Sequence, residues 1–163
     1  MIDSGRKIVG RAALARIARR MEDRGKRLVF TNGCFDLLHA GHVRLLKRAR
    51  RLGDALAVAV NSDASVRRLK GRGRPVTPQR ERLEILASLE SVDYVVVFTD
   101  PTPGALIRAV RPHVLVKGGD WRRSRIVGRG TVEAAGGRVR VIPLEKSVST
   151  TRIIRRILAR FGR

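Results

Sequence analysis

The sequence predicts an α/β protein in which a five-stranded parallel sheet lies between two layers of helices. Segments with helical periodicity alternate with short apolar runs along the chain, which is typical of a parallel sheet with helical crossovers. The run from Ala55 to Val60 is continuously apolar, as expected for a strand buried on both faces. The unusual residues, such as His39 and Gly41, come just after predicted strands, where parallel sheets bind ligands.

The first half of the chain contains the clearest periodicity. Residues 11–24 place apolar side chains on one helical face and arginines off it, so they predict a helix. Residues 28–31 predict a short strand, residues 41–52 a helix and residues 55–60 the buried strand. We expect residues 1–163 to form one domain, with the helical segment 1–25 packed on it.

The second half repeats the alternation. Thr77 resembles an N-cap that is followed by proline at the first helical position, so it predicts a helix that runs through Leu89. The last helix starts at Ser149-Thr150-Thr151, and we expect it to bury Ile153, Ile154, Ile157 and Leu158. Between these helices the pattern predicts strands at 94–98, 114–117 and 139–142 and helices near 102–110 and 126–136. The fold class is therefore a Rossmann-like α/β/α sandwich.

Composition and charge exclude several classes of protein. The longest apolar run is far shorter than the roughly 20 residues of a membrane span, and the first residues lack the apolar segment of a secretory signal. A single cysteine, Cys34, excludes an intramolecular disulfide. We therefore expect a cytoplasmic protein.

The net charge of +22 invites a polynucleotide-binding interpretation. Aromatic residues make up only 4% of the chain and do not alternate with basic ones, so the pattern that stacks bases is missing. A solvated, arginine-rich surface would also account for the charge, and so would a phosphorylated substrate.

Two histidines flank the predicted start of the helix at Gly41. His39 and His42 are three residues apart, and helix N-termini expose N–H groups that bind anions. Imidazoles at this point can donate hydrogen bonds to phosphate oxygens, and a glycine between them lets the backbone come close to a ligand. Surface or capping histidines are the alternative. A zinc site lacks a third ligand nearby, although Asp36 could be argued.

These residues carry a resemblance to a known family. The segment from Asn32-Gly-Cys-Phe-Asp to His39-Ala-Gly-His42 resembles the HxGH signature of nucleotidylyltransferases related to the cytidylyltransferases. The likeness continues through Arg68-Leu-Lys70-Gly, Lys117-Gly-Gly-Asp120 and Ser149-Thr-Thr151, and it covers nearly the whole chain. The order and spacing look most like the adenylyltransferase domain of ADP-heptose synthases.

The resemblance implies a role for each matching residue. His39, His42 and Lys70 would contact the phosphates and act in catalysis, although Lys70, in a glycine-flanked loop, could be one more solvated lysine. Ser149, Thr150 and Thr151 would hold the β- and γ-phosphates, with plain N-capping as the alternative. Asp36, Asp63 and Arg82 are acceptor or phosphate candidates, with a turn-fixing role for Asp36 and a salt bridge for Arg82 as alternatives. The remaining nucleotide-binding candidates are Thr31, Asn32, Gly33, Cys34, Phe35, Gly41, Lys117, Gly118 and Asp120.

The implied activity is transfer of AMP from ATP to heptose 1-phosphate, with Mg²⁺ carried by the triphosphate rather than by protein ligands. A cytidylyltransferase that uses CTP and glycerol 3-phosphate, or another small phosphate or phosphonate, remains open, as does a polynucleotide-binding protein on the same fold. The family is often fused to a sugar kinase, and the resemblance implies that a separate kinase supplies the acceptor here. It also suggests a homodimer, and no membrane partner is expected.

Overall fold

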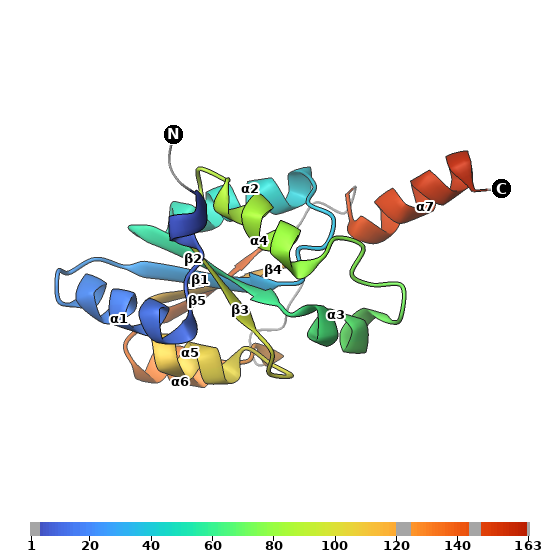
Figure 1. Ribbon diagram of the computed structural model, residues 1–163. Coiled ribbons are helices and arrows are strands. Elements are labelled where there is room, and N and C mark those ends of the chain that lie inside the picture. The colour runs from blue at the N-terminus through green and yellow to red at the C-terminus, as the bar shows by residue number, and fades with distance from the viewer. Residues whose placement is uncertain (1–3, 120–124, 144–147, 163) are drawn as a thin grey trace.

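The fold is a five-stranded, all-parallel sheet with helices on both faces (Figure 1), as predicted. The computed structural model describes residues 4–119, 125–143 and 148–162. The strands are β1 (Leu28–Gly33), β2 (Ala55–Asn61), β3 (Tyr94–Phe98), β4 (Val114–Gly118) and β5 (Arg138–Ile142). The helices are the 3₁₀ turn η1 (Ser4–Lys7), α1 (Arg11–Glu22), α2 (Ala40–Arg50), α3 (Asp63–Lys70), α4 (Gln79–Ala87), α5 (Gly104–Val110), α6 (Arg129–Ala134) and α7 (Thr150–Phe161).

The strand order β3-β2-β1-β4-β5 places the first strand in the middle of the sheet. The chain adds strands on one side of β1 and then crosses to the other, so β2 and β4 both pair with β1. A change of direction of this kind opens a crevice beyond the carboxyl end of the central strand. The segments that follow β1 and β4 therefore border the place where this fold binds ligands.

Two separate apolar cores hold the layers together. Leu14 and Ala18 of α1 pack with residues of α5 and α6 against one face of the sheet. Leu46 and Ala49 of α2 pack with residues of α4 against the other face. All seven residues of β2 are buried, because both faces of the sheet are covered. The predicted sandwich is thus confirmed layer by layer.

Several element ends differ from the sequence prediction. Thr77 does not cap α4: Pro78 holds the N-cap position, and its carbonyl accepts from the Arg82 N–H. The sequence pattern also missed α3, in which only Ser65 and Val66 are buried, too few for a visible period. Lys70, expected in a loop, is the last residue of this helix.

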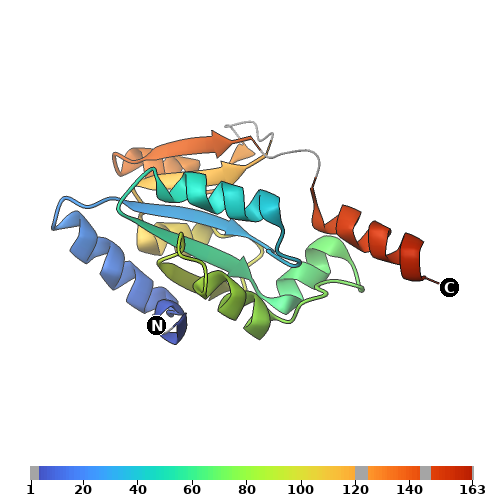
Figure 2. The ribbon, with the colours of Figure 1, turned by 90° about the horizontal axis from the view of Figure 1, so that it is seen from above.

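The prediction that α7 buries its apolar residues is wrong. The helix runs outward from the rest of the molecule in both views (Figures 1 and 2) and contains no buried residue. Ile153 and Ile154 are half-buried, whereas Leu158 is 61% and Phe161 77% exposed. Within the described ranges, no helix is long and apolar enough to cross a membrane.

Candidate active site beyond the carboxyl end of the central strand

The two histidines lie side by side at the start of α2. The rings of His39 and His42 stack with their centroids 3.8 Å apart, and Phe35 lies 5.1 Å from the His42 ring. His39 is the N-cap residue of α2, but its side chain makes no capping hydrogen bond. The capping role that the sequence left open for His39 is therefore wrong.

Gly41 is required by the packing of this pair. A Cβ atom at Gly41 would lie 3.1 Å from the His39 ring, tighter than most side-chain contacts. The sequence suggested that Gly41 admits a ligand to the backbone, but in the structure its missing side chain leaves room for an imidazole. Gly33 has the same relation to Phe35, whose ring lies 3.1 Å from the Cβ position of Gly33.

The Nδ1 atoms of His39 and His42 are buried, and neither has a hydrogen-bond partner within the described part of the chain. A buried polar atom without a partner is costly, and such atoms gather where a ligand is to supply the missing bond. Burial lowers the pKa of His39, and burial together with the neighbouring His39 lowers the pKa of His42 to about 4. Both rings are therefore mostly neutral at pH 7.

The low pKa of His42 predicts how the free protein titrates. In a two-dimensional NMR titration, the His42 ring signals should move with a midpoint near 4, well below the ordinary 6.5. Addition of ATP should raise that midpoint, because an adjacent phosphate favours the protonated ring. Since the unfolded chain binds this proton below pH 6.5 and the folded chain does not, His42 also makes the free energy of unfolding decrease as the pH falls from about 6.5 to 4. A midpoint near 6.5 in the free protein would contradict the burial of His42.

The histidines form one wall of a pocket of about 320 Å³. The N-terminus of α7 forms another wall, where Ser149 Oγ accepts from the Arg152 N–H at 3.2 Å and caps the helix. Thr150 Oγ1 donates to the Leu37 carbonyl at 3.4 Å and ties this helix to the turn after β1. The pocket brings together these predicted site residues: Cys34, Phe35, Asp36, His39, His42, Lys70, Ser149, Thr150 and Thr151.

Two cations complete the pocket lining. Lys70 was predicted, whereas Arg74 was not named as a site residue, although the segment Arg74-Pro75-Val76 also resembles the family. Arg74 Nε donates to a carboxylate oxygen of Asp36. The other Asp36 oxygen accepts from the N–H groups of Val76 and Thr77 at 2.8 and 2.9 Å. Asp36 therefore fixes the segment after α3, as the turn-fixing alternative proposed, and brings Arg74 to the pocket.

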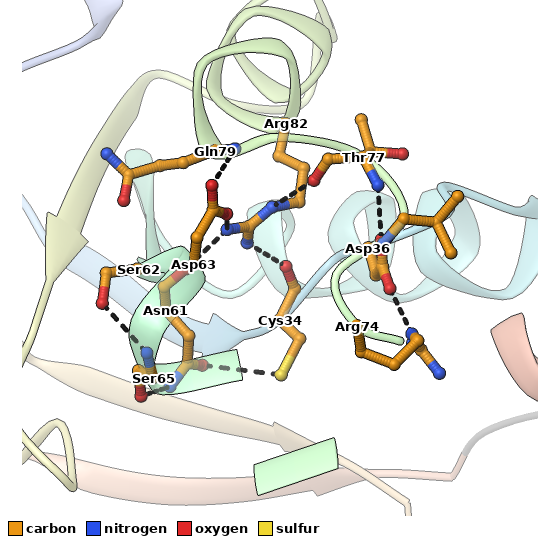
Figure 3. A network of polar contacts seen from close by, with 11 residues as sticks. Cys34, Asp36, Asn61, Ser62, Asp63, Ser65, Arg74, Thr77, Gln79 and Arg82 are labelled. Atoms are coloured by element: carbon orange, nitrogen blue, oxygen red, sulfur yellow. Dashed lines mark hydrogen bonds and ion pairs between the residues drawn. The ribbon is translucent and has the colours of Figure 1, made fainter. Parts of the chain in front are cut away.

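Arg82 does not line this pocket and instead lies within a network of polar contacts (Figure 3). It is 1% exposed, and it donates to the carbonyls of Thr77, Cys34 and Asn61 and to the Asp63 carboxylate. Its donors are engaged within the protein, and it does not line the pocket. The prediction that Arg82 is a phosphate ligand is therefore wrong, and Arg82 has a structural role in which it holds neighbouring segments together. Asp63 belongs to the same network of contacts. Burial raises the pKa of Asp63, but hydrogen bonds from Arg82 and from the Gln79 N–H outweigh the effect of burial, so the pKa is lowered overall.

Cys34 lines the pocket without the features of a nucleophile. Its thiol is 3.9 Å from Asn61 Oδ1, and burial raises its pKa against the opposing charges of Lys70, Arg82 and Arg74. A thiol with a raised pKa is mostly protonated at neutral pH and therefore unreactive. Cys34 is therefore a residue of the pocket lining and not a nucleophile.

A second group of predicted residues follows the same sheet edge to β4. Lys117 Nζ donates to Asn32 Oδ1, joining the ends of the two strands at the change of direction. Burial lowers the pKa of Lys117 to about 8. Thr31 is buried inside β1, and Gly118 ends β4. Asp120 lies outside the described residues. Among the described residues, no group of three or more His, Cys, Asp and Glu side chains could hold a metal ion.

Comparison with known proteins gives consistent matches. A cytidylyltransferase-like family model matches residues 30–156. The bifunctional protein HldE of Pelobacter propionicus is 54% identical over 160 residues, 98% of this chain and 33% of that protein. The HldE protein of Syntrophotalea carbinolica is 58% identical over 138 residues, 85% of this chain and 28% of that protein. The chain thus spans about a third of the length of these curated relatives.

A solved structure extends the match to three dimensions. The lipopolysaccharide core biosynthesis protein from Thermoplasma volcanium superposes with a TM-score of 0.62 and 27% sequence identity, over 76% of this chain and all of that one. The matched family segment begins in β1 and runs into α7, so it includes both histidines and the Ser149–Thr151 turn. The chain belongs to the cytidylyltransferase-like family.

Proposed function

We propose that the chain transfers AMP from ATP to heptose 1-phosphate and releases ADP-heptose and pyrophosphate. The observation that carries this proposal is the pair of histidines that line the pocket, each with a buried imidazole nitrogen that has no partner in the described structure, together with two cations and a helix N-terminus. Each of these groups stabilises negative charge. The specific acceptor rests on the family and on relatives that share more than half of their residues with this chain over the matched segment.

The chemistry explains why the pocket is built from donors and cations. The second pKa of a phosphate monoester is about 6, so the acceptor is mostly a dianion at neutral pH and needs no general base. Its oxygen attacks the α-phosphorus of ATP, a new P–O bond forms, and the bond to the bridging oxygen of pyrophosphate breaks. The barrier comes from repulsion between two anions and from charge that develops on the leaving group, so catalysis consists of positioning and electrostatic stabilisation.

Different residues of the pocket would contact different phosphates of ATP. The rings of His39 and His42 would hydrogen-bond the phosphates, with His42 next to the α-phosphate in the transition state. Lys70 and Arg74 would neutralise charge on the pyrophosphate, and the N-terminus of α7 would offer its N–H groups to the β- and γ-phosphates. The substrate would be the Mg²⁺ complex of ATP, in which the metal is carried by phosphate oxygens.

Other parts of the relatives suggest the source of the acceptor. Because the relatives are named bifunctional and the chain matches about a third of them, the remainder of those proteins has room for a second activity. We propose that a separate kinase supplies the sugar 1-phosphate to this chain and that both enzymes work in the cytoplasm.

Pyrophosphate release tests the proposal directly. The assay pairs MgATP and MgCTP separately with heptose 1-phosphate and glycerol 3-phosphate. Release with ATP and heptose 1-phosphate alone is the expected result. Release with CTP or glycerol 3-phosphate would keep the chemistry but overturn the substrate assignment, and no release with any pair would contradict the proposed activity.

Lys117 offers a prediction about nucleotide binding. We expect Lys117→Met to raise KM for ATP about 10-fold or more, because a charge-assisted hydrogen bond contributes roughly 1.5–3 kcal/mol. The change should leave kcat within a few-fold of the wild type, since Lys117 lies on β4 and outside the histidine pocket. Lys47→Met on α2 is the matched control and should change neither constant. A lowered kcat with an unchanged KM would place Lys117 at the reacting phosphates instead.

A further inference from the structure

The two histidines belong to a row of three rings that meets a glycine at each end. The centroid of the Phe35 ring lies 5.1 Å from that of His42 at an interplanar angle of 59°, and the His42 ring stacks on His39 at 3.8 Å. A Cβ atom at Gly33 would lie 3.1 Å from the Phe35 ring, and one at Gly41 would lie 3.1 Å from the His39 ring. At both ends, therefore, a side chain is missing where a ring needs the space.

The backbone of Phe35 has an uncommon conformation. Its φ angle is 46°, in the left-handed region, where a bulky side chain crowds the backbone. Over the ranges that the structure describes, Arg111 is the one other residue besides glycine with a positive φ, and it ends α5, where this conformation is common. Phe35 lies outside any helix. A strained conformation of this kind persists only where the surroundings require it, and such residues gather at functional sites.

The orientation of the His42 ring depends on packing. The torsion that turns an imidazole about its Cβ–Cγ bond is broad, so a contact has to fix it. A hydrogen bond at the second ring nitrogen commonly does this, but Nδ1 of His42 has no partner among the described residues. The aromatic rings that pack against His42 are those of Phe35 and His39. His39 itself has a buried Nδ1 without a partner in the same part of the chain, which leaves Phe35 as the member of the row that is held by apolar packing.

Phe35 also has an ordinary place in the apolar core. It is 6% exposed and belongs to the core cluster that includes Leu45 and Leu46 of α2. Core packing requires an apolar residue of this size, but it requires neither a flat ring nor the open space above Gly33. The two roles predict different results. A role in the core alone affects the stability of the fold, whereas a positioning role also affects the state of His42.

We propose that Phe35 is a positioning residue, whose ring occupies the space above Gly33 and fixes the orientation of the His42 imidazole. The contact of that imidazole with phosphate rests on the proposed function, whereas its orientation in the free protein does not. Position 33 is then a glycine because the ring needs the space, and not because a ligand approaches the backbone. Since Phe35 acts through His42, its loss lowers kcat more than it raises KM.

Phe35→Leu tests the proposal, with Phe30→Leu as the matched control. Both substitutions remove a buried ring from β1 or from the turn after it, but Phe30 lies in the core on the other face of the sheet. With MgATP and heptose 1-phosphate, Phe35→Leu should lower kcat about 10-fold or more and change KM for ATP by less than about three-fold. In the free protein, the NMR midpoint of His42 should rise from about 4 toward 6.5, because the imidazole becomes more solvated. Phe30→Leu should also lower the stability, but it should leave kcat and this midpoint unchanged.

Gly33→Ala tests the same contact from the other side. The φ angle of Gly33 is not in the left-handed region, so the backbone accepts alanine, and the atoms nearest to the added methyl group belong to the Phe35 ring. This variant should also lower kcat and raise the His42 midpoint. In Gly33→Ala/Phe35→Leu the smaller leucine leaves room for the methyl group, so kcat should be no lower than in Phe35→Leu alone. Losses that multiply would overturn the assignment of Gly33 to the ring, because they would show that Gly33 acts on the ligand.

The two measurements distinguish positioning from other roles of Phe35. An unchanged kcat in Phe35→Leu would overturn the proposal, and so would a lower kcat with an unchanged His42 midpoint, since Phe35 would then act on the substrate directly. If the wild type releases no pyrophosphate with any substrate pair, the proposed reaction fails, but the midpoints in the free protein still test the proposal. Midpoints near 4 in both Phe35→Leu and Gly33→Ala would then overturn it. Circular dichroism checks that each variant is folded, and if Phe35→Leu is not, Gly33→Ala tests the same contact.

Discussion

Replacing His42 with alanine should lower kcat/KM for pyrophosphate release by about 10²–10³-fold, the cost of removing one donor from a site that stabilises a transition state. The thermal midpoint should change by only a few degrees, because Nδ1 of His42 makes no hydrogen bond on which the described fold depends. His42 is the more buried member of the stacked pair, and it remains neutral over the pH range in which the acceptor is a dianion. The measurement is steady-state turnover with MgATP and heptose 1-phosphate, alongside thermal unfolding.

Two further substitutions at His42 identify the nitrogen that acts. The amide of asparagine lies near the position of Nδ1, and that of glutamine lies near Nε2. If Nδ1, which has no partner in the described structure, binds phosphate, His42→Asn should retain more activity than His42→Gln. The reverse order would show that Nε2 binds the phosphate.

His113 provides a matched control for these variants. Its Nδ1 accepts from the Leu28 N–H at 3.2 Å, and it precedes β4 at the opposite end of that strand from Lys117. His113→Ala should lower the free energy of unfolding by about 1 kcal/mol and leave kcat/KM nearly unchanged. Turnover of His42→Ala within about three-fold of the wild type would contradict the assignment of His42.

Local sequence signals predicted the fold and the part of the candidate site whose residues are neighbours in the sequence. The apolar run of β2 and the periodic residues of α1 and α2 determine which faces are buried, so the order of the layers could be predicted from them. His39, Gly41 and His42 lie within one helical turn, so their spacing alone brings them together. The Ser149–Thr151 turn was matched through the resemblance, because its contact with Leu37 joins distant parts of the chain.

Residues that depend on distant contacts were harder to predict. Arg74 reaches the pocket only because Asp36, 38 positions earlier, binds it, and no local pattern records that pairing. The exposed apolar face of α7 shows a second limit of prediction from the sequence. Helical periodicity indicates that a face needs a partner, but it does not indicate whether the partner is the same chain.

Replacing Arg82 with methionine should lower the free energy of unfolding by about 3–5 kcal/mol, because three backbone carbonyls lose their donor at roughly 1–3 kcal/mol each. The guanidinium is the shared donor for three backbone carbonyls and one carboxylate, so its loss leaves buried acceptors unsatisfied at the ends of β1 and β2 and before α4. Urea unfolding monitored by circular dichroism measures this change. An exposed arginine of the same helix, changed as Arg80→Met, should alter the free energy by less than about 0.5 kcal/mol.

The pH dependence of the free energy of unfolding distinguishes the contribution of the Arg82–Asp63 ion pair from that of apolar packing. The pKa of Asp63 in the folded chain is below its ordinary value of 3.8, so its pairing stabilises the fold above that pH, and this contribution is lost as the pH falls through the folded pKa. In Arg82→Met the main cause of the lowering is gone, so the acid-dependent part of the stability should shrink relative to the wild type. A variant that unfolds like the wild type in both urea and acid would show that the carbonyls of Cys34 and Asn61 find other donors. The turn that carries His39 and His42 would then be held without Arg82.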